Sequence, residues 1–298
     1  MTEKTVHNAV MVEETMLVLD VKSGGHYLDG TLGGGTHTEE LLKRSKPDGH
    51  VISLDVDRSA LARATERFAT YGDRWKGVEA NFRHLASVAE QENLALLDGI
   101  LLDVGLSSDE LENSSLGISF QKDGPLDMRL GPKSNDDGLT AAEVINSWTQ
   151  QDLETVIRTF GEERYARRIA AQIVKARKSA RIIRTLELVS VIRSVVPHTY
   201  EGGRIHFATR TFQALRIVVN DELQALKDAI RGAQTVLKPG GHLAILTFHS
   251  LEDRIVKLAF TGTEAWEPIT KKPMMASEEE TKENPRSRTA KLRAAIKK

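Results

Sequence analysis

The chain of 298 residues is long enough for one large domain or two ordinary ones, and its 40% hydrophobic and 28% charged content is typical of a soluble globular protein. It has no run of about 18 apolar residues, so we expect no membrane-spanning helix and no membrane partner. The absence of cysteine excludes disulfides, thiolate metal sites and reactions that need a thiolate nucleophile, whereas the formal net charge of −1 predicts no particular partner.

The first hundred residues alternate short apolar runs with helical patterns. The N-terminus lacks the apolar core of a signal peptide, so we expect a cytoplasmic protein. The pattern predicts strands at 26–29, 50–55 and 99–103, and helices at 38–44 and 58–70. Such alternation is typical of a parallel, doubly wound sheet, in which ligands bind at the carboxyl ends of the strands. Each predicted strand ends in an aspartate, and we expect the three to face one crevice: Asp29, Asp55 and Asp103.

After Asp103 the alternation stops and helical patterns dominate. Residues 113–138 are rich in Gly, Ser, Asn and Asp and predict a long loop. Helices are then predicted at 140–147, 151–160, 162–178 and 185–195, a long helix or helix pair at 208–237, and a strand at 242–248. We therefore predict an α/β fold with a Rossmann-like domain, residues 1–112 and 206–298, interrupted by an inserted, mostly helical domain, residues 113–205. The polar tail after Gly262 is expected to be loosely held, with Trp266 and Pro268 as anchors.

Two segments of this nearly neutral chain are strongly basic. Residues 164–184 contain eight Lys and Arg and no acid, and residues 282–298 contain seven against one acid. Two such segments suggest a polyanionic partner that is met by one face of the protein. A solvated helix face and a frayed tail would give the same pattern, so charge alone leaves both interpretations open.

A glycine-rich loop follows the first predicted strand and opens the first predicted helix. It reads LDGTLGGGTH over residues 28–37 and lets backbone N–H groups approach a ligand. No Gly-Lys-Ser/Thr follows, which excludes a P-loop, and the nicotinamide fingerprint G-x-G-x-x-G is not completed at Thr38. S-adenosylmethionine fits better, because Asp55 would accept hydrogen bonds from the ribose hydroxyls, while Asp29 and Asp103 would face its cationic groups. A structural turn with ordinary strand-end acids is the alternative.

Several longer strings resemble one known family, in order and over nearly the whole chain. They are DGTLGGGTH (29–37), DGILLDVGLSS (98–108), GISFQKDGPLDMR (117–129), GEERYARRIA (161–170), ATRTFQALRIVVNDEL (208–223), LKPGGHLAILTFHSLEDRIVK (237–257) and NPRSRTAKLR (284–293). Together they resemble the bacterial 16S rRNA (cytosine-N4)-methyltransferase family, RsmH or MraW. The resemblance implies a class I methyltransferase sheet with a helical insertion, S-adenosyl-L-methionine as cofactor, and one decoding-centre cytidine of 16S rRNA in the small ribosomal subunit as substrate, methylated at its exocyclic N4.

The resemblance also implies which residues contact the cofactor. These positions are Gly35, Thr36, His37, Asp55, Phe82, Asp103 and Glu110. Three residues depart from the family pattern: Thr36 replaces a glycine, Glu110 replaces a glutamine and Phe207 replaces a proline. Thr36 adds a side chain where close backbone approach matters, and Glu110 adds a charge.

The chemistry of amine methylation suggests candidate catalytic residues. The lone pair of cytosine N4 is delocalised into the ring, so an acceptor for the amino hydrogens would assist the reaction. Asp103 is the candidate, helped by Ser107 or Ser108, although cofactor binding alone would also explain Asp103. His249 follows the last predicted strand and could contact the base, while a structural role is the simpler interpretation. The lack of cysteine independently favours an amine target, because methylation at pyrimidine C5 commonly needs a thiolate.

The remaining expectations concern RNA, metals and assembly. Arginines that could hold RNA phosphates are Arg164, Arg167, Arg168, Arg204, Arg210 and Arg216. We find no metal-ligand cluster in the sequence, and a homodimer is compatible with it. Three alternative functions stay open: a DNA amino-methyltransferase, for which the Pro-Pro motif after the strand that ends at Asp103 is missing, a nicotinamide-dependent oxidoreductase, and a non-catalytic ribosome-assembly factor that binds RNA.

Overall fold

The computed structural model describes residues 9–94, 96–131, 138–197, 199–200 and 205–298, and it divides the chain into two compact units. Unit 1 comprises Met1–Gly105 and Leu223–Lys298, and unit 2 comprises Leu106–Glu222. The predicted insertion, 113–205, is thus shorter than unit 2 at both ends. The reason at the C-terminal end is helix α10 (Thr209–Asn220), which packs against helix α7 (Gln150–Gly161) within unit 2.

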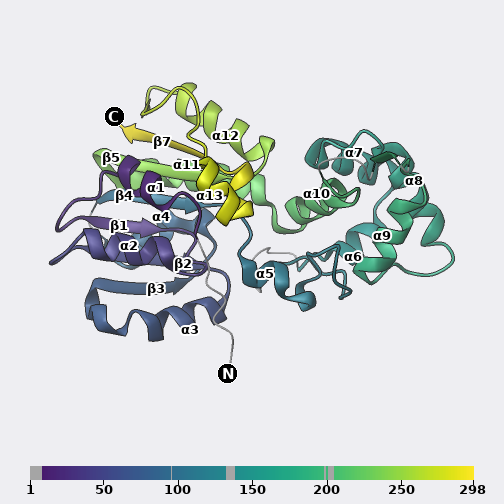
Figure 1. Cartoon of the computed structure of the whole chain (residues 1–298), viewed down its shortest axis with the longest axis horizontal. Helices are drawn as coiled ribbons and strands as arrows, with labels where there is room; N and C mark the ends of the chain where they lie inside the picture. Colours follow the sequence, from purple (N-terminus) through teal and green to yellow (C-terminus); the bar gives the residue numbers. More distant parts are fainter. Residues whose placement is uncertain (1–8, 95, 132–137, 198, 201–204) are drawn as a thin grey trace. The chain divides into compact units, whose positions relative to one another are not determined.

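Unit 1 is built on one seven-stranded sheet with the order β3-β2-β1-β4-β5-β7-β6 (Figure 1). Its strands are β1 (His26–Asp29), β2 (His50–Asp55), β3 (Trp75–Glu79), β4 (Leu97–Asp103), β5 (Leu237–Thr247), β6 (Trp266–Pro268) and β7 (Lys291–Lys297). The first five are parallel, and β7 runs antiparallel between β5 and β6. The predicted fold class, a Rossmann-like methyltransferase sheet with a mostly helical second domain, is confirmed.

Helices cover both faces of this sheet. One apolar cluster joins it to α1 (Val12–Val18), α2 (Thr36–Arg44) and α3 (Arg58–Arg67). The other joins it to α4 (Leu85–Gln91), α11 (Glu222–Val236) and α12 (Ser250–Thr261). Successive residues of β4 serve both clusters, because Leu101 faces the first and Leu102 the second, as the two-residue repeat of a strand requires. Burial on both sides fixes the register of the strands and holds their carboxyl ends at one edge.

The C-terminal tail is the main error of the sequence-based prediction. It is not loosely held: after α13 (Glu278–Glu283) and the 3₁₀ turn η5 (Pro285–Thr289), strand β7 pairs with β5 from His242↔Ile296 to Thr247↔Lys291. Figure 1 shows β7, in yellow, beside β5. Residues Leu292–Ala295 are buried. The strand escaped prediction because its short apolar centre is flanked by lysines, and its partner lies far away in the sequence.

Of the two possibilities predicted for 208–237, a long helix or a helix pair, the structure has the helix pair. Helix α10 ends and α11 begins around Asp221, whose φ of 48° is left-handed and breaks the helical path. Among the described helices, none is both long and apolar enough to cross a membrane.

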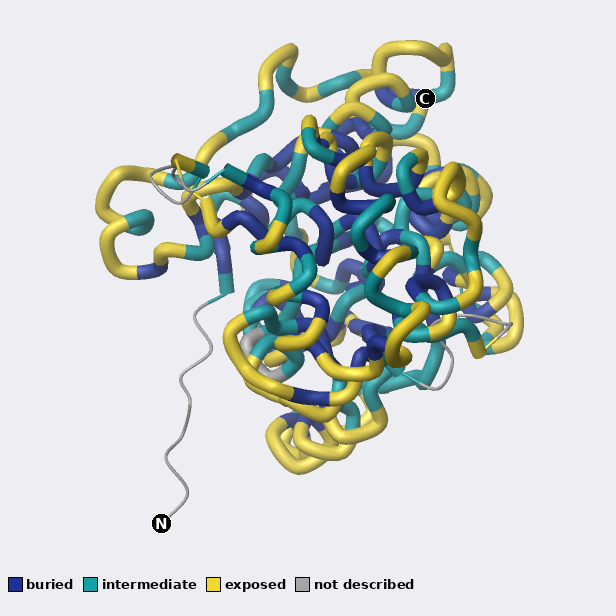
Figure 2. Tube along the Cα trace, turned by 90° about the vertical axis from the view of Figure 1, so that its right-hand side faces the viewer, coloured by how far each residue is buried: buried dark blue, intermediate teal, exposed yellow. Residues whose placement is uncertain are grey.

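Unit 2 encloses a separate apolar core. Its helices are α5 (Ser108–Glu112), α6 (Ala141–Ser147), α7, α8 (Ala166–Ala176), α9 (Thr185–Arg193) and α10. The described part of the long loop, residues 113–131, is attached to this core, because Leu126 N–H donates to the carbonyl of Ile183 at 2.8 Å. Within the loop the backbone is closely packed: a Cβ on Gly124 would lie 1.9 Å from the carbonyl oxygen of Ser114. Figure 2 shows buried backbone in the interior and exposed residues on the outer turns.

Candidate active site

The glycine loop lies across the carboxyl ends of three strands of unit 1. Gly30 N–H donates to the carbonyl of Leu101 at 2.8 Å, and Gly33 N–H donates to Oδ2 of Asp55 at 2.9 Å. The loop ends at Gly35, the N-cap of α2, with a left-handed φ of 78°. A Cβ on Gly35 would lie 2.9 Å from the ring of Phe68, so both conformation and space favour glycine there.

Asp29 is fully buried and supports the loop from within. Its carboxylate accepts the Thr31 N–H at 3.1 Å and the Thr38 hydroxyl at 2.7 Å, and Thr38 continues to the hydroxyl of Ser53 at 2.8 Å. Burial raises the pKa of Asp29, an effect that these hydrogen bonds oppose. The expectation that Asp29 faces a cationic ligand is wrong, because its oxygens bind protein donors and none of its surface is exposed.

Asp55 ends β2 and connects the glycine loop with α3. Besides the Gly33 bond, its Oδ1 accepts the N–H of Asp57 at 2.8 Å, and Asp57 in turn caps α3 through Ser59 N–H. Burial raises the pKa of Asp55. Each carboxylate oxygen keeps a second lone pair, so Asp55 can still accept hydrogen bonds from a ribose diol.

Asp103 ends β4 and has one carboxylate oxygen available. Its N–H donates to the Thr31 hydroxyl at 2.7 Å, which fixes the backbone. Its Oδ2 lies 3.6 Å from Nε2 of His37, an ion-pair distance longer than a hydrogen bond. Its Oδ1 is buried and, among the described residues, without a hydrogen-bond partner. A buried acceptor without a partner costs about 1–3 kcal/mol, which is a reason to expect a ligand donor at this position.

His37 sits in the first turn of α2 and is 5% exposed. Neither ring nitrogen has a hydrogen-bond partner among the described residues. Burial alone would lower the pKa of His37, but the Asp103 carboxylate, with Asp29 also nearby, reverses this and raises the pKa. The Asp103 carboxylate therefore favours the protonated form of this imidazole.

The other cofactor candidates of unit 1 lie at the same edge. Thr36 is the first residue of α2, and Phe82 begins the 3₁₀ turn η2 (Phe82–His84) that follows β3. A Cβ on Gly30 would lie 3.2 Å from the Cβ of Phe82, which places this phenylalanine beside the loop. The structure thus gathers six candidates at the carboxyl edge of the sheet: Gly35, Thr36, His37, Asp55, Phe82 and Asp103.

Ser107 and Glu110 belong to unit 2 and form a reciprocal cap on α5. The Ser107 N–H donates to Oε2 of Glu110 at 2.6 Å, and the Glu110 N–H donates to the Ser107 hydroxyl at 3.1 Å. The glutamate in place of the family's glutamine thus has a structural use. The roles predicted for them, catalysis for Ser107 and cofactor binding for Glu110, stay predictions.

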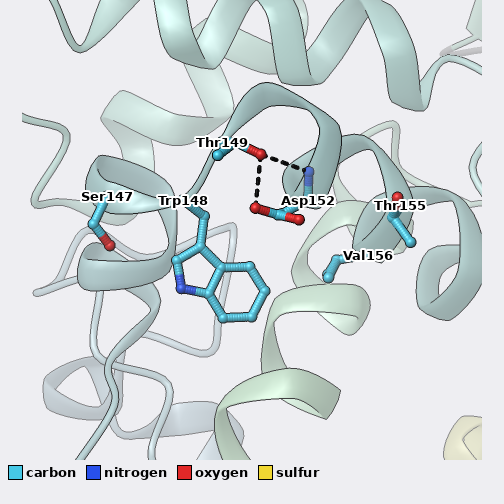
Figure 3. A pocket seen from close by; sticks show the side chains of 6 residues that line it. All are labelled: Ser147, Trp148, Thr149, Asp152, Thr155 and Val156. Atoms are coloured by element: carbon cyan, nitrogen blue, oxygen red, sulfur yellow. Dashed lines mark hydrogen bonds between the residues drawn. The ribbon is translucent and has the colours of Figure 1, made fainter.

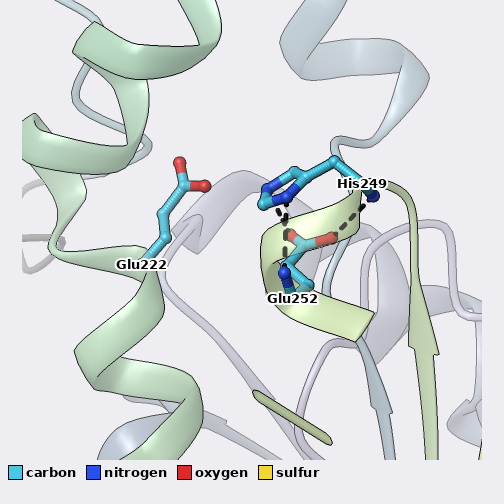
Figure 4. Close-up of side chains that lie close together, drawn as sticks. All are labelled: Glu222, His249 and Glu252. Carbon is cyan, nitrogen blue, oxygen red and sulfur yellow. Dashed lines mark hydrogen bonds and ion pairs between the residues drawn. The ribbon is translucent and has the colours of Figure 1, made fainter. Parts of the chain in front are cut away.

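His249 caps helix α12 (Figure 4). Its Nδ1 accepts the Glu252 N–H at 3.4 Å, and its Nε2 lies 3.1 Å from Oε1 of Glu252, which is 3% exposed and accepts the N–H groups of Phe248 and His249. These contacts give His249 a structural role, and its catalytic role stays a prediction. Glu222, also drawn there, belongs to unit 2, where Arg216 binds its carboxylate.

The six arginines predicted to bind RNA differ in their surroundings. Arg164, Arg167 and Arg168 are exposed, whereas Arg204 lies outside the described residues. Arg210 donates to the carbonyl of Glu162. Arg216 is only 14% exposed and forms two hydrogen bonds with Glu222, so its guanidinium is already engaged.

A depression of about 530 Å³ in unit 2 is less informative (Figure 3). Trp148 lines it together with the hydroxyls of Ser147, Thr149 and Thr155. All three hydroxyls donate to nearby oxygens: to the carbonyl of Glu143, to the carboxylate of Asp152 and to the carbonyl of Gln151. The hydrogen of each of these hydroxyls is thus already used within the protein.

Sequence reasoning missed the hydroxyl residues that order the site. Thr31 holds the backbone of Asp103, and Thr38 with Ser53 binds Asp29. A threonine two residues after the first strand-end aspartate was the available signal, but its partner Asp103 lies 72 residues away.

The chain is similar to a family of methylases over nearly its whole length. The family model described as the MraW methylase family matches residues 4–298. Proteins named ribosomal RNA small subunit methyltransferase H are similar to the chain: that of Symbiobacterium thermophilum is 46% identical, with 98% of this chain and 96% of the relative covered, and that of Geotalea uraniireducens is 45% identical, with 98% of each covered. The one from Desulfotalea psychrophila is 43% identical, with 100% of each covered. Among solved structures, a putative rRNA methylase from Clostridium thermocellum aligns with a TM-score of 0.46 and 11% identity, covering 98% of each chain.

Proposed function

Because the chain belongs to the MraW methylase family, we propose that it transfers a methyl group from S-adenosyl-L-methionine to the exocyclic N4 of a cytidine in 16S rRNA of the small ribosomal subunit. The proposed methyl transfer to an amino group rests mainly on one observation at Asp103, the last residue of β4. Its buried Oδ1 has no hydrogen-bond partner among the described residues. The names of the relatives support the RNA substrate.

The residues at this edge fit the proposed cofactor. The glycine loop keeps the backbone open, Asp55 retains lone pairs for two ribose hydroxyls, and the buried ring nitrogens of His37 lack partners that a polar ligand would supply. We assign cofactor binding to Gly35, Thr36, His37, Asp55, Phe82 and Asp103, with Glu110 as a further proposed contact. When bound, the sulfonium supplies an electrophilic methyl group.

Asp103 is the proposed acceptor for the amino group of the target cytosine. Its Oδ1 would accept one N4 hydrogen, which turns the nitrogen lone pair out of conjugation and toward the methyl carbon. The same carboxylate would take the surplus N4 proton after methylation and release it to water. Thr31 fixes the backbone of Asp103, and Nε2 of His37 lies 3.6 Å from its Oδ2.

The test is methyl transfer from labelled S-adenosylmethionine to small ribosomal subunits that lack the modification, with the product nucleoside identified by mass spectrometry. We expect N4-methylcytidine in 16S rRNA. Cofactor binding without transfer would favour an RNA-binding assembly factor, and transfer to DNA instead would identify an amino-methyltransferase of the other class.

A further inference from the structure

Unit 2 contains a cluster of two tyrosines and two arginines arranged around a buried glutamate. Glu163 is 1% exposed, and its two oxygens accept the N–H of Tyr165 at 2.8 Å and the hydroxyl of Tyr200 at 2.6 Å. The two rings meet edge to face with centroids 5.4 Å apart. Glu163 thus fixes the backbone of Tyr165 and the ring hydroxyl of Tyr200. The group formed by Glu163, Arg164, Tyr165, Arg168 and Tyr200 is called the tyrosine–arginine cluster below.

The guanidinium groups of this cluster lie over the rings. The guanidinium carbon of Arg164 is 4.7 Å from the centroid of Tyr165 and 5.2 Å from that of Tyr200, and that of Arg168 is 5.9 Å from Tyr165. Stacking over an aromatic face holds a guanidinium without consuming its N–H groups. Both arginines are exposed, so solvent or a ligand can reach them.

Three other arginines of unit 2 pair with acids, and Arg164 and Arg168 do not. Arg158 binds Glu154 at 2.6 Å, Arg184 binds Asp123 at 2.7 Å and Arg216 binds Glu222 at 2.7 Å. Within the described ranges, neither Arg164 nor Arg168 forms an ion pair with a carboxylate. The nearest acid in sequence, Glu163, uses both oxygens to hold the tyrosines.

Helix α8 extends the positive surface. Its buried face consists of Ala166, Ile169, Ala170 and Ile173. The basic residues of this helix therefore occupy its outer face, and the segment 164–184 itself contains no acid. A planar, ordered guanidinium in an uncompensated positive field is well suited to a phosphate group, which it can bind through two parallel hydrogen bonds.

We propose that the tyrosine–arginine cluster binds the phosphate backbone of the RNA substrate, with Arg164 and Arg168 as the phosphate ligands. The proposal rests on the proposed function for its substrate class and names where unit 2 holds that substrate. The tyrosines position the guanidiniums and lower the entropy that ordering two long side chains would otherwise cost. Arg216 is left out, because Glu222 engages it.

The experiment measures binding of a single-stranded RNA oligonucleotide to the full chain by fluorescence anisotropy over a range of salt concentrations. The variants are Arg164→Ala, Arg168→Ala and the double variant. Each substitution should weaken RNA binding about 10-fold and reduce the slope of log affinity against log salt concentration by about 0.7. The matched control is Arg158→Ala, an exposed arginine on α7 that already binds Glu154, and it should leave affinity and slope unchanged. Arg164→Lys should keep the slope and lose part of the affinity, because it keeps the charge and loses the planar stacking.

Wild-type affinity and slope in the double variant would overturn the proposal. So would normal RNA binding combined with lost binding to intact small subunits, since the cluster would then contact a ribosomal protein. Calorimetric binding of S-adenosylmethionine and the thermal unfolding midpoint should match the wild type in every variant, which excludes misfolding as the cause. If the wild-type protein binds RNA in this way but transfers no methyl group, the proposed function fails while the RNA site stands.

Discussion

The carboxyl edge of the sheet in unit 1 and the tyrosine–arginine cluster in unit 2 use polar groups in opposite ways. At the edge, charged and polar side chains face inward: Asp29 is fully buried, and His37 and Asp103 leave buried atoms unpaired. In the cluster, the acid is buried and the arginines remain exposed. Buried charges at the edge interact strongly with a small ligand, because the dielectric constant there is low. Exposed charges in the cluster can bind a large polyanion, but salt screens their interactions. Substitutions should therefore have large, local effects at the edge and smaller, salt-dependent effects in the cluster.

The largest effect is expected at Asp103. Asp103→Asn removes the charge and half the acceptor capacity at the atom assigned to the cytosine amino group, so single-turnover methylation at saturating cofactor should slow by about 10²–10⁴-fold. Cofactor affinity, measured separately by calorimetry, should change far less. Full turnover in this variant would reduce Asp103 to a cofactor-binding residue.

A substitution at Gly35 shows how closely the glycine loop packs against Phe68. Gly35→Ala forces a Cβ into a left-handed conformation and toward Phe68, and should lower the free energy of unfolding by about 2–4 kcal/mol. Gly240→Ala is the matched control, because Gly240 has the same φ of +78° and nothing within 4 Å of the added Cβ. Denaturant unfolding should show a smaller loss for the control. Equal losses would mean that backbone strain alone, and not the contact with Phe68, explains the glycine.

Within unit 2, a partly buried and an exposed arginine–glutamate ion pair should differ in how much each contributes to the free energy of unfolding. Arg216→Met leaves the carboxylate of Glu222, 14% exposed, without its partner and should destabilise the protein by about 2 kcal/mol. Arg158→Met removes an exposed pair on one helix and should cost at most about 0.5 kcal/mol. If chemical denaturation gives both the same cost, burial does not distinguish these ion pairs.

The smallest effect concerns pH and His37. The folded pKa of His37 is raised above its usual value near 6.5, so the imidazolium contributes stability that is fully present below that value and is lost as pH rises through the folded pKa. Unfolding measured at a series of pH values should show this loss for the wild type and not for His37→Asn. An NMR titration of the ring gives the pKa directly, and a value below 6.5 would contradict the ion pair with Asp103.

Local sequence patterns and the family resemblance predicted where the site lies and which residue types form it. Three aspartates at strand ends and a glycine loop before a helix predict the carboxyl edge of a doubly wound sheet, because strand and helix periodicities are short-range signals. The resemblance added Phe82, which the structure places beside the loop. The basic segment at 164–184 was also visible as composition alone.

Tertiary structure decided which polar groups are free. Asp29 and Asp103 look alike in sequence, but Thr31 and Thr38 engage both oxygens of the first and only the backbone of the second. Tyr200 joins Glu163 across 37 residues, and β7 joins β5 across more than forty. Such pairings depend on chain crossings and strand register, which no local window contains. The residues that carry chemistry could thus be predicted as types, while the orientation of each oxygen and ring follows from long-range packing.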